Sequence, residues 1–124
     1  MSDLKDIAQN CSDSFYDVVN QSILITDLSN VIAASGPLKK KYLNKEISKD
    51  ICEMIKNRSK TSDSNVNNLE IINGVSEESW IIVSPVLVSG DIVGAVIILS
   101  DTKITDLMEM TSDFIAKFLS RHLQ

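Results

Sequence analysis

Apolar residues near both ends of the chain recur at intervals of three and four, the spacing of one face of an α-helix. In residues 3–20 this stripe comprises Leu4, Ile7, Ala8, Cys11, Phe15, Val18 and Val19. From Thr105 to the end it comprises Leu107, Met108, Thr111, Phe114, Ile115, Phe118, Leu119 and His122. The pattern predicts a helix in each segment, with one long apolar face available for packing.

Short runs rich in β-branched residues predict strands between these two helices. Residues 22–27 and 31–35 are joined by a short polar connection and predict a β-hairpin. Residues 80–88 and 92–99 are nearly unbroken apolar runs joined by Ser89-Gly90-Asp91, which predicts a second hairpin. Because continuous hydrophobicity indicates that both faces of a strand are covered, we expect these two strands to be central in the sheet.

Two residues within the central strands predict local irregularity. Pro85 has no N–H for the hydrogen-bond ladder, so we expect a bulge or a bend there. Gly94 indicates either a bulge or a position where another backbone segment comes very close.

The middle of the chain has a mixed pattern. Residues 38–60 have helical periodicity and predict two short helices, the second capped by Ser48. Residues 61–68 are polar and predict a loop, 69–73 predict a short strand, and 74–78 predict a turn.

The predicted order of elements is α-ββ-αα-βββ-α in a single domain, residues 1–124. Helices segregated to the faces of an antiparallel sheet of about five strands define an α+β fold. We expect the N- and C-terminal helices to pack beside each other on one face. The two short helices and the 61–68 loop would then cover the other face.

Charge and composition narrow the class of protein. The formal net charge is −5 and the isoelectric point is about 4.7, which disfavours binding of nucleic acid or of an anionic membrane by this domain alone. No apolar run approaches the roughly 18 residues of a membrane span, and no signal peptide is present. Two well-separated cysteines without an export signal indicate reduced thiols and a cytoplasmic location.

The sequence contains no recognisable catalytic constellation. It has neither a phosphate-binding glycine loop nor a zinc-protease motif, and no His cluster accompanies Cys11 or Cys52. His122, the one histidine, cannot be tied to a nucleophile by spacing. We therefore expect neither an enzyme nor a metal or other cofactor.

Several residues have both a structural and a functional interpretation. Trp80 and Tyr42 are each either core residues or pocket walls. Four lysines lie within seven positions, at Lys39, Lys40, Lys41 and Lys45. A solvated basic face explains that cluster more readily than a phosphate site does. For a ligand held between the sheet and the 36–60 helices, we expect contacts from Ser35, Lys39, Tyr42, Trp80 and Ser84.

Beyond these patterns, the chain resembles a known family from about Phe15 to its end. The similar segments are FYDVVNQSILITD, SGPLKKKYLNKEIS, NNLEIINGVSEE, SPVLVSGDIVGAVIILSD and DFIAKFLSRHLQ. They resemble the C-terminal GAF domains of transcription regulators of the stage V sporulation protein T type. The resemblance implies a GAF-like fold and places the lysine cluster on a helix beside the pocket, rather than on a DNA-binding surface.

The resemblance also implies what this chain lacks. The family's N-terminal AbrB-type DNA-binding domain has no counterpart here, so we expect either an excised regulatory domain or a stand-alone relative. GAF domains of the cyclic-nucleotide type carry a signature that LNKEIS matches only superficially, so we do not expect a cyclic-nucleotide ligand.

Two functional hypotheses remain. The first is a sensory domain that binds an unidentified small molecule and forms a homodimer. The second is a purely structural oligomerisation scaffold whose pocket is filled by its own side chains, Leu38, Tyr42 and Trp80. In either case we expect the dimer to form through the outer helices, by Leu4, Ile7, Cys11, Leu107, Phe114 and Phe118.

Overall fold

The computed structural model describes residues 3–57 and 61–124, without the side chains of residues 3, 61–69 and 76–78. It contains four helices and five strands in the predicted order. They are α1 (Asp3–Val19), β1 (Ser22–Thr26), β2 (Val31–Ser35), α2 (Lys39–Tyr42), α3 (Lys49–Lys56), β3 (Thr61–Ile72), β4 (Val75–Val88), β5 (Asp91–Ser100) and α4 (Asp106–His122). The α+β prediction is confirmed.

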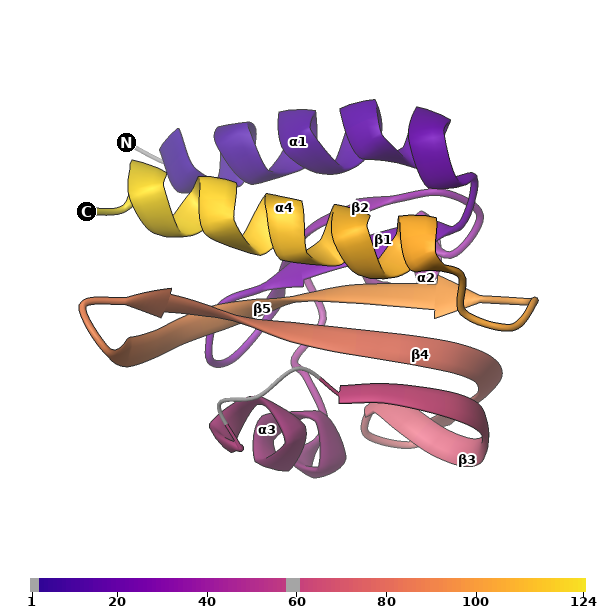
Figure 1. Cartoon of the computed structure of the whole chain (residues 1–124). Helices are drawn as coiled ribbons and strands as arrows, with labels where there is room; N and C mark the ends of the chain where they lie inside the picture. Colours follow the sequence, from indigo (N-terminus) through magenta and orange to yellow (C-terminus); the bar gives the residue numbers. More distant parts are fainter. Residues whose placement is uncertain (1–2, 58–60) are drawn as a thin grey trace.

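The five strands form one antiparallel sheet in the order β2-β1-β5-β4-β3. As predicted, the strand of residues 92–99 is central, between β1 and β4. Helices α1 and α4 lie side by side on one face and run in opposite directions, whereas α3 covers the other face (Figure 1). The sheet thus separates two layers of helices.

Alternation along the strands produces two apolar cores, one on each face of the sheet. Ile23, Ile82 and Ile98 pack against α1 and α4. Their neighbours Ile81 and Ile97 point to the opposite face and pack against Tyr42 and the apolar stripe of α3. Continuous hydrophobicity in the central strands therefore has the predicted cause, since both faces are covered.

Two predictions in the middle of the chain were wrong. Residues 61–68 are not a loop but the first part of β3, and residues 75–78 are not a turn but the start of β4. The two strands pair from Thr61↔Val83 to Ile72↔Val75, with three register shifts. Backbone hydrogen bonds form this ladder whatever the side chains are, and a terminal strand of a sheet tolerates polar residues that a central strand does not.

The β4–β5 hairpin has the predicted turn and the predicted irregularities. Ser89 and Gly90 both have positive φ, 52° and 86°, which is the backbone of a two-residue hairpin turn. One register shift lies next to Val86, close to Pro85. At Gly94 a Cβ would lie 2.0 Å from the Thr26 carbonyl oxygen, so the close backbone approach is confirmed.

The predicted helices are confirmed within the described residues. The Ser48 hydroxyl accepts a hydrogen bond from the Ile51 N–H at 3.1 Å and caps α3. That helix ends at Lys56; the predicted extension to Lys60 includes residues 58–60, which lie outside the described residues. None of the helices in the described part of the chain has the length and hydropathy needed to cross a membrane.

Candidate functional site

The five residues predicted to bind a ligand do not come together. Tyr42 and Lys39 belong to α2, on the α3 side of the sheet. Ser35 and Ser84 point to the opposite side, because their hydroxyls bond to α1 and α4 respectively. Strand alternation places half-buried Trp80 on the side of Ser84. Because the sheet separates these five residues, they do not line one pocket.

The space between α3 and the sheet is largely filled by the chain itself. Tyr42, Ile51 and Ile55 are at most 1% exposed, and Leu38 packs against them. A cavity of about 80 Å³ remains next to Cys52, well below the roughly 300 Å³ of the smallest usual ligand pockets. A hollow of about 600 Å³ is lined, among the described residues, by one flank of α3 and Asn57.

The lysine cluster forms an exposed basic surface on and after α2. Lys40, Lys41 and Lys45 are exposed, and Lys39 is half-buried. The Lys41 Nζ lies 5.5 Å from the centroid of the Tyr42 ring, a cation–π distance. These positions agree with a solvated basic face.

Ser35 belongs to a polar network that attaches α1 to the outer strand β2. Its hydroxyl lies 2.8 Å from the Ser12 hydroxyl and donates a hydrogen bond to the Asp13 carboxylate. The Gln9 carboxamide donates to the Ala34 carbonyl at 2.7 Å and accepts from the Ala34 N–H at 3.1 Å. Because these polar groups form hydrogen bonds with one another, Ser35 has a structural role here.

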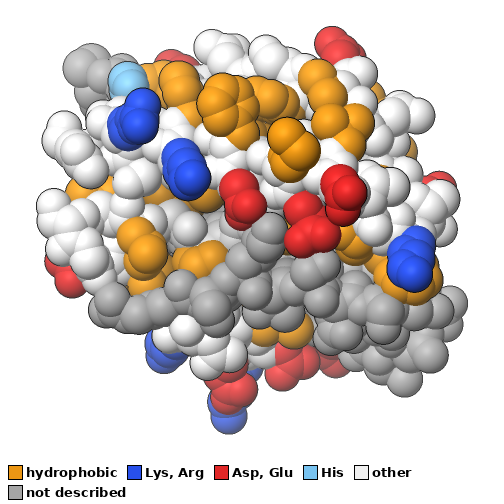
Figure 2. Space-filling view, in the orientation of Figure 1, with side chains coloured by type: hydrophobic (Ala, Val, Ile, Leu, Met, Phe, Trp, Pro, Cys, Tyr) orange, Lys and Arg blue, Asp and Glu red, His pale blue; other side chains and the backbone are white. Residues whose placement is uncertain are grey.

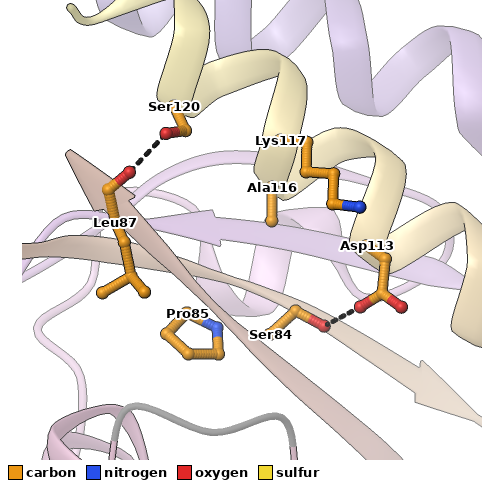
Figure 3. A pocket seen from close by; sticks show the side chains of 7 residues that line it. All are labelled: Ser84, Pro85, Leu87, Asp113, Ala116, Lys117 and Ser120. Carbon is orange, nitrogen blue, oxygen red and sulfur yellow. Dashed lines mark hydrogen bonds between the residues drawn. The ribbon is translucent and has the colours of Figure 1, made fainter. Parts of the chain in front are cut away.

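A groove lined by both polar and apolar groups lies between α4 and the end of β4 (Figure 3). Its volume is about 280 Å³. The lining residues are Ser84, Pro85 and Leu87 from β4, and Asp113, Ala116, Lys117 and Ser120 from α4. We call this cavity the α4–β4 groove.

Hydrogen bonds fix both walls of the α4–β4 groove. The Ser84 hydroxyl donates to the Ser112 Oγ at 2.9 Å and lies 3.5 Å from the Asp113 Oδ1. About two turns further along α4, the Ser120 hydroxyl donates to the Leu87 carbonyl. Ser84 is only 2% exposed, whereas Lys117 is exposed at the rim. Sequence analysis identified Ser84 but missed the other lining residues. The available signal was the polar series at 113, 117 and 120 along one flank of the last helix.

Large apolar side chains are exposed along the outer surface of α1 and α4. Figure 2 shows several groups of orange side chains gathered over the two helices. Val18, Leu107, Met110, Phe114 and Phe118 are between 47% and 67% exposed. We call these five residues, together with half-buried Phe15, the α1–α4 apolar face.

The residues predicted to form a dimer interface fall into two groups. Leu107, Phe114 and Phe118 are exposed on the α1–α4 apolar face. Leu4 and Ile7 are half-buried against the core, and Cys11 is buried within it. Burial raises the pKa of the Cys11 thiol, as expected for a group that loses solvation of its charged form. Among the described residues no group of His, Cys, Asp and Glu side chains could hold a metal ion.

Solved structures with the same fold are GAF domains and related proteins. The GAF domain of a phosphoenolpyruvate-protein phosphotransferase from Coxiella burnetii matches with a TM-score of 0.77 at 10% identity, over 97% of this chain and 82% of that chain. The cofactor-binding GAF domain of the nutrient sensor CodY from Clostridium difficile matches with a TM-score of 0.68 at 14% identity, over 94% and 83%. Identity this low establishes the fold alone.

Sequence comparison is more specific. Stage V sporulation protein T of Bacillus subtilis (strain 168) is 34% identical over 126 residues, which is 100% of this chain and 71% of the relative. The family described as Stage V sporulation protein T C-terminal, transcription factor, matches residues 3–124. This chain therefore belongs to the stage V sporulation protein T C-terminal family of transcription factors, and its fold is that of a GAF domain.

Proposed function

We propose that this chain is a non-catalytic regulatory domain of a sporulation transcription regulator, and that it dimerises through the α1–α4 apolar face. The family is that of a transcription factor. The observation that supports dimerisation is the group of half-exposed Leu, Met, Val and Phe side chains on two adjacent helices. Contiguous apolar surface of this kind marks interaction sites in proteins that otherwise expose such residues singly.

The energetic argument favours a second copy as the partner. Fully burying a large apolar side chain contributes about 1.5–3 kcal/mol, and side chains that are about half exposed would contribute roughly half of this each. A two-fold axis presents the same five residues from both copies, so the gain is doubled. It must offset the loss of translational and rotational freedom, which costs on the order of 4–15 kcal/mol.

The arrangement of the helices suits such a symmetric pairing. Helices α1 and α4 already lie side by side (Figure 1), and stacking two such pairs produces a four-helix bundle. In that bundle each copy contributes the same surface. A change in the packing of the outer helices would then alter the relative position of whatever domains are attached to them.

The fully buried Tyr42 and the filled space under α3 favour the scaffold hypothesis for that face of the sheet. Sensing by this domain would therefore need a different site. Sedimentation velocity of the chain at tens of micromolar tests the dimer directly. We expect a dimer at this concentration, and a clean monomer would contradict the proposal.

A further inference from the structure

We propose that α4 of one copy packs antiparallel on α4 of the second copy, centred on Phe114, with Asp106 of each copy paired to Arg121 of the other. This pairing rests on the dimer proposed above. It specifies which helix of the second copy meets α4, in which direction, and which charged residues set the alignment.

The exposed apolar residues of α4 are arranged symmetrically about Phe114. Leu107 and Met110 precede it by seven and four residues, and Phe118 and Arg121 follow it by four and seven. The four apolar side chains are 47% to 67% exposed, and this spacing places all five residues on one face of the helix. When two copies of that face meet in opposite directions with Phe114 on the two-fold axis, Met110 of each copy lies opposite Phe118 of the other.

Charge along α4 is separated into an acidic start and a basic end. Asp106 and Glu109 lie in its first turn, and Arg121 and His122 lie in its last. Figure 2 shows acidic side chains toward the start of α4 and basic side chains toward its end. Asp106 and Arg121 are both exposed. In the antiparallel pair they lie within about 1.5 Å of the same level along the axis, so two contacts between opposite charges form. Such contacts determine the register of an interface more than its strength.

Other pairings bring like charges together, which is unfavourable. Parallel pairing of α4 with α4 would place Asp106 opposite Asp106 and Arg121 opposite Arg121. A two-fold axis parallel to the helices would instead place α4 on α1 of the second copy, with levels along the bundle preserved. Because Phe15 lies at the level of Phe114 and α1 runs opposite to α4, Asp17 would then meet the acidic half of α4.

The antiparallel pairing also determines where the two chains enter the bundle. In each copy the start of α1 lies beside the end of α4 (Figure 1). Because the two α4 helices run in opposite directions, the starts of the two α1 helices lie at opposite ends of the four-helix bundle. Helix α4 has 17 residues, about 25 Å at 1.5 Å per residue. Domains joined to the start of α1 would therefore be held at opposite ends rather than side by side.

Disulfide cross-linking tests the direction of the pairing. Met110→Cys and Phe118→Cys are made in a Cys52→Ala background, in which the other cysteine, Cys11, is buried. At a concentration where both variants sediment as dimers, we expect oxidation of the mixture to join one variant to the other. Neither variant should join to itself, because like positions lie about 12 Å apart along the axis, too far for a disulfide. Self-linked Met110→Cys without mixed product would indicate parallel pairing, and dimers without any cross-link would place the interface elsewhere. Either result would overturn the proposal.

Charge reversal tests the ion pair. Arg121→Glu and Asp106→Arg should each weaken the dimer at least about fivefold at roughly 50 mM salt, where charges are weakly screened. An equimolar mixture of the two variants should regain the affinity of the unmodified chain, because both contacts then join opposite charges. The control is Lys40→Glu, at an exposed lysine of α2, which should leave the affinity unchanged.

Sedimentation equilibrium provides these affinities. Undiminished dimers of both single variants, or no recovery on mixing, would refute the pairing of Asp106 with Arg121. Monomeric behaviour of the unmodified chain at tens of micromolar would instead contradict the dimer itself, so the two failures are distinguishable.

Discussion

The rings of Phe15 in α1 and Phe114 in α4 meet edge to face, with their centroids 5.5 Å apart and an interplanar angle of 80°. Such aromatic pairs contribute about 0.5–1.5 kcal/mol beyond the area that they bury. Phe114 also remains 59% exposed. The same side chain therefore joins the two outer helices and offers surface to a partner.

Placing a charge on this exposed ring should abolish self-association without unfolding the domain. We expect Phe114→Glu to sediment as a monomer, because a buried carboxylate without a partner is strongly unfavourable in an apolar interface. The matched control is Leu28→Glu, since Leu28 is 56% exposed in the β1–β2 turn, outside the α1–α4 apolar face. A Phe114→Glu dimer as strong as that of the control would place the interface elsewhere.

Gly94 should tolerate no side chain. In Gly94→Ala the new methyl group would lie 2.0 Å from the Thr26 carbonyl oxygen in the adjacent central strand. We expect a loss of about 3 kcal/mol or more in the free energy of unfolding, measured by urea denaturation. Gly74→Ala serves as the control: nothing lies within 4 Å of its Cβ position, although its φ is +85°. Gly74→Ala should lower the free energy of unfolding by about 1–2 kcal/mol, from backbone strain alone. A larger loss there than at Gly94 would refute the steric argument.

The Gln9 carboxamide should be important for the attachment of α1 to β2. Gln9→Ala removes both hydrogen bonds to Ala34, the donated one of 2.7 Å and the accepted one of 3.1 Å. We expect a loss of about 1–3 kcal/mol in thermal or chemical unfolding, because the Ala34 backbone groups are left without these partners. Asn10→Ala, at an exposed neighbouring position, should change stability by less than about 0.5 kcal/mol.

The two cysteines should differ in reactivity. Cys11 is buried and its pKa is raised by desolvation, whereas Cys52 is half-buried. We expect an aromatic disulfide reagent at neutral pH to modify Cys52 in the native protein and Cys11 only after unfolding. Rapid modification of Cys11 in the folded Cys52→Ala variant would contradict this expectation.

Cys11 also gives stability a pH dependence. Because its pKa in the folded state is above that in the unfolded state, its protonated form favours folding. This contribution is complete below the unfolded pKa of about 8.5. It is lost as the pH rises through the folded pKa. As the pH rises into the alkaline range, we expect the free energy of unfolding to decrease less steeply for Cys11→Ala than for the unmodified chain.

This domain alone should not bind DNA. Its formal net charge is −5, and nucleic-acid affinity depends mainly on neutralisation of phosphates by basic side chains. Fluorescence anisotropy with a labelled duplex at roughly 100 mM salt provides the measurement. Salt-sensitive binding in the micromolar range would contradict the expectation and direct attention to the lysines of α2.

Sequence patterns predicted the elements that bury apolar surface. The apolar stripes of α1 and α4 have helical periodicity, and β4 and β5 contain continuous apolar runs, because burial selects the residues of these elements. Residues 61–68 show no such apolar pattern, because β3 depends on backbone pairing with β4. The groove was missed for a related reason. Asp113, Lys117 and Ser120 come together with Ser84 only through the packing of α4 on β4, and spacing within one helix does not reveal which strand lies opposite.

The hydrogen bonds on the outer side of β2 also limit how this protein can aggregate. Ala34 is paired with the Gln9 carboxamide, and Val31 exchanges backbone hydrogen bonds with Asn44 and Lys45. A foreign strand needs unpaired N–H and C=O groups in order to extend a sheet. At Val31 and Ala34 these groups are already occupied, so a foreign strand cannot pair with the β2 edge at these two positions. The same two contacts make this part of the β2 edge a poor surface for strand pairing between folded chains.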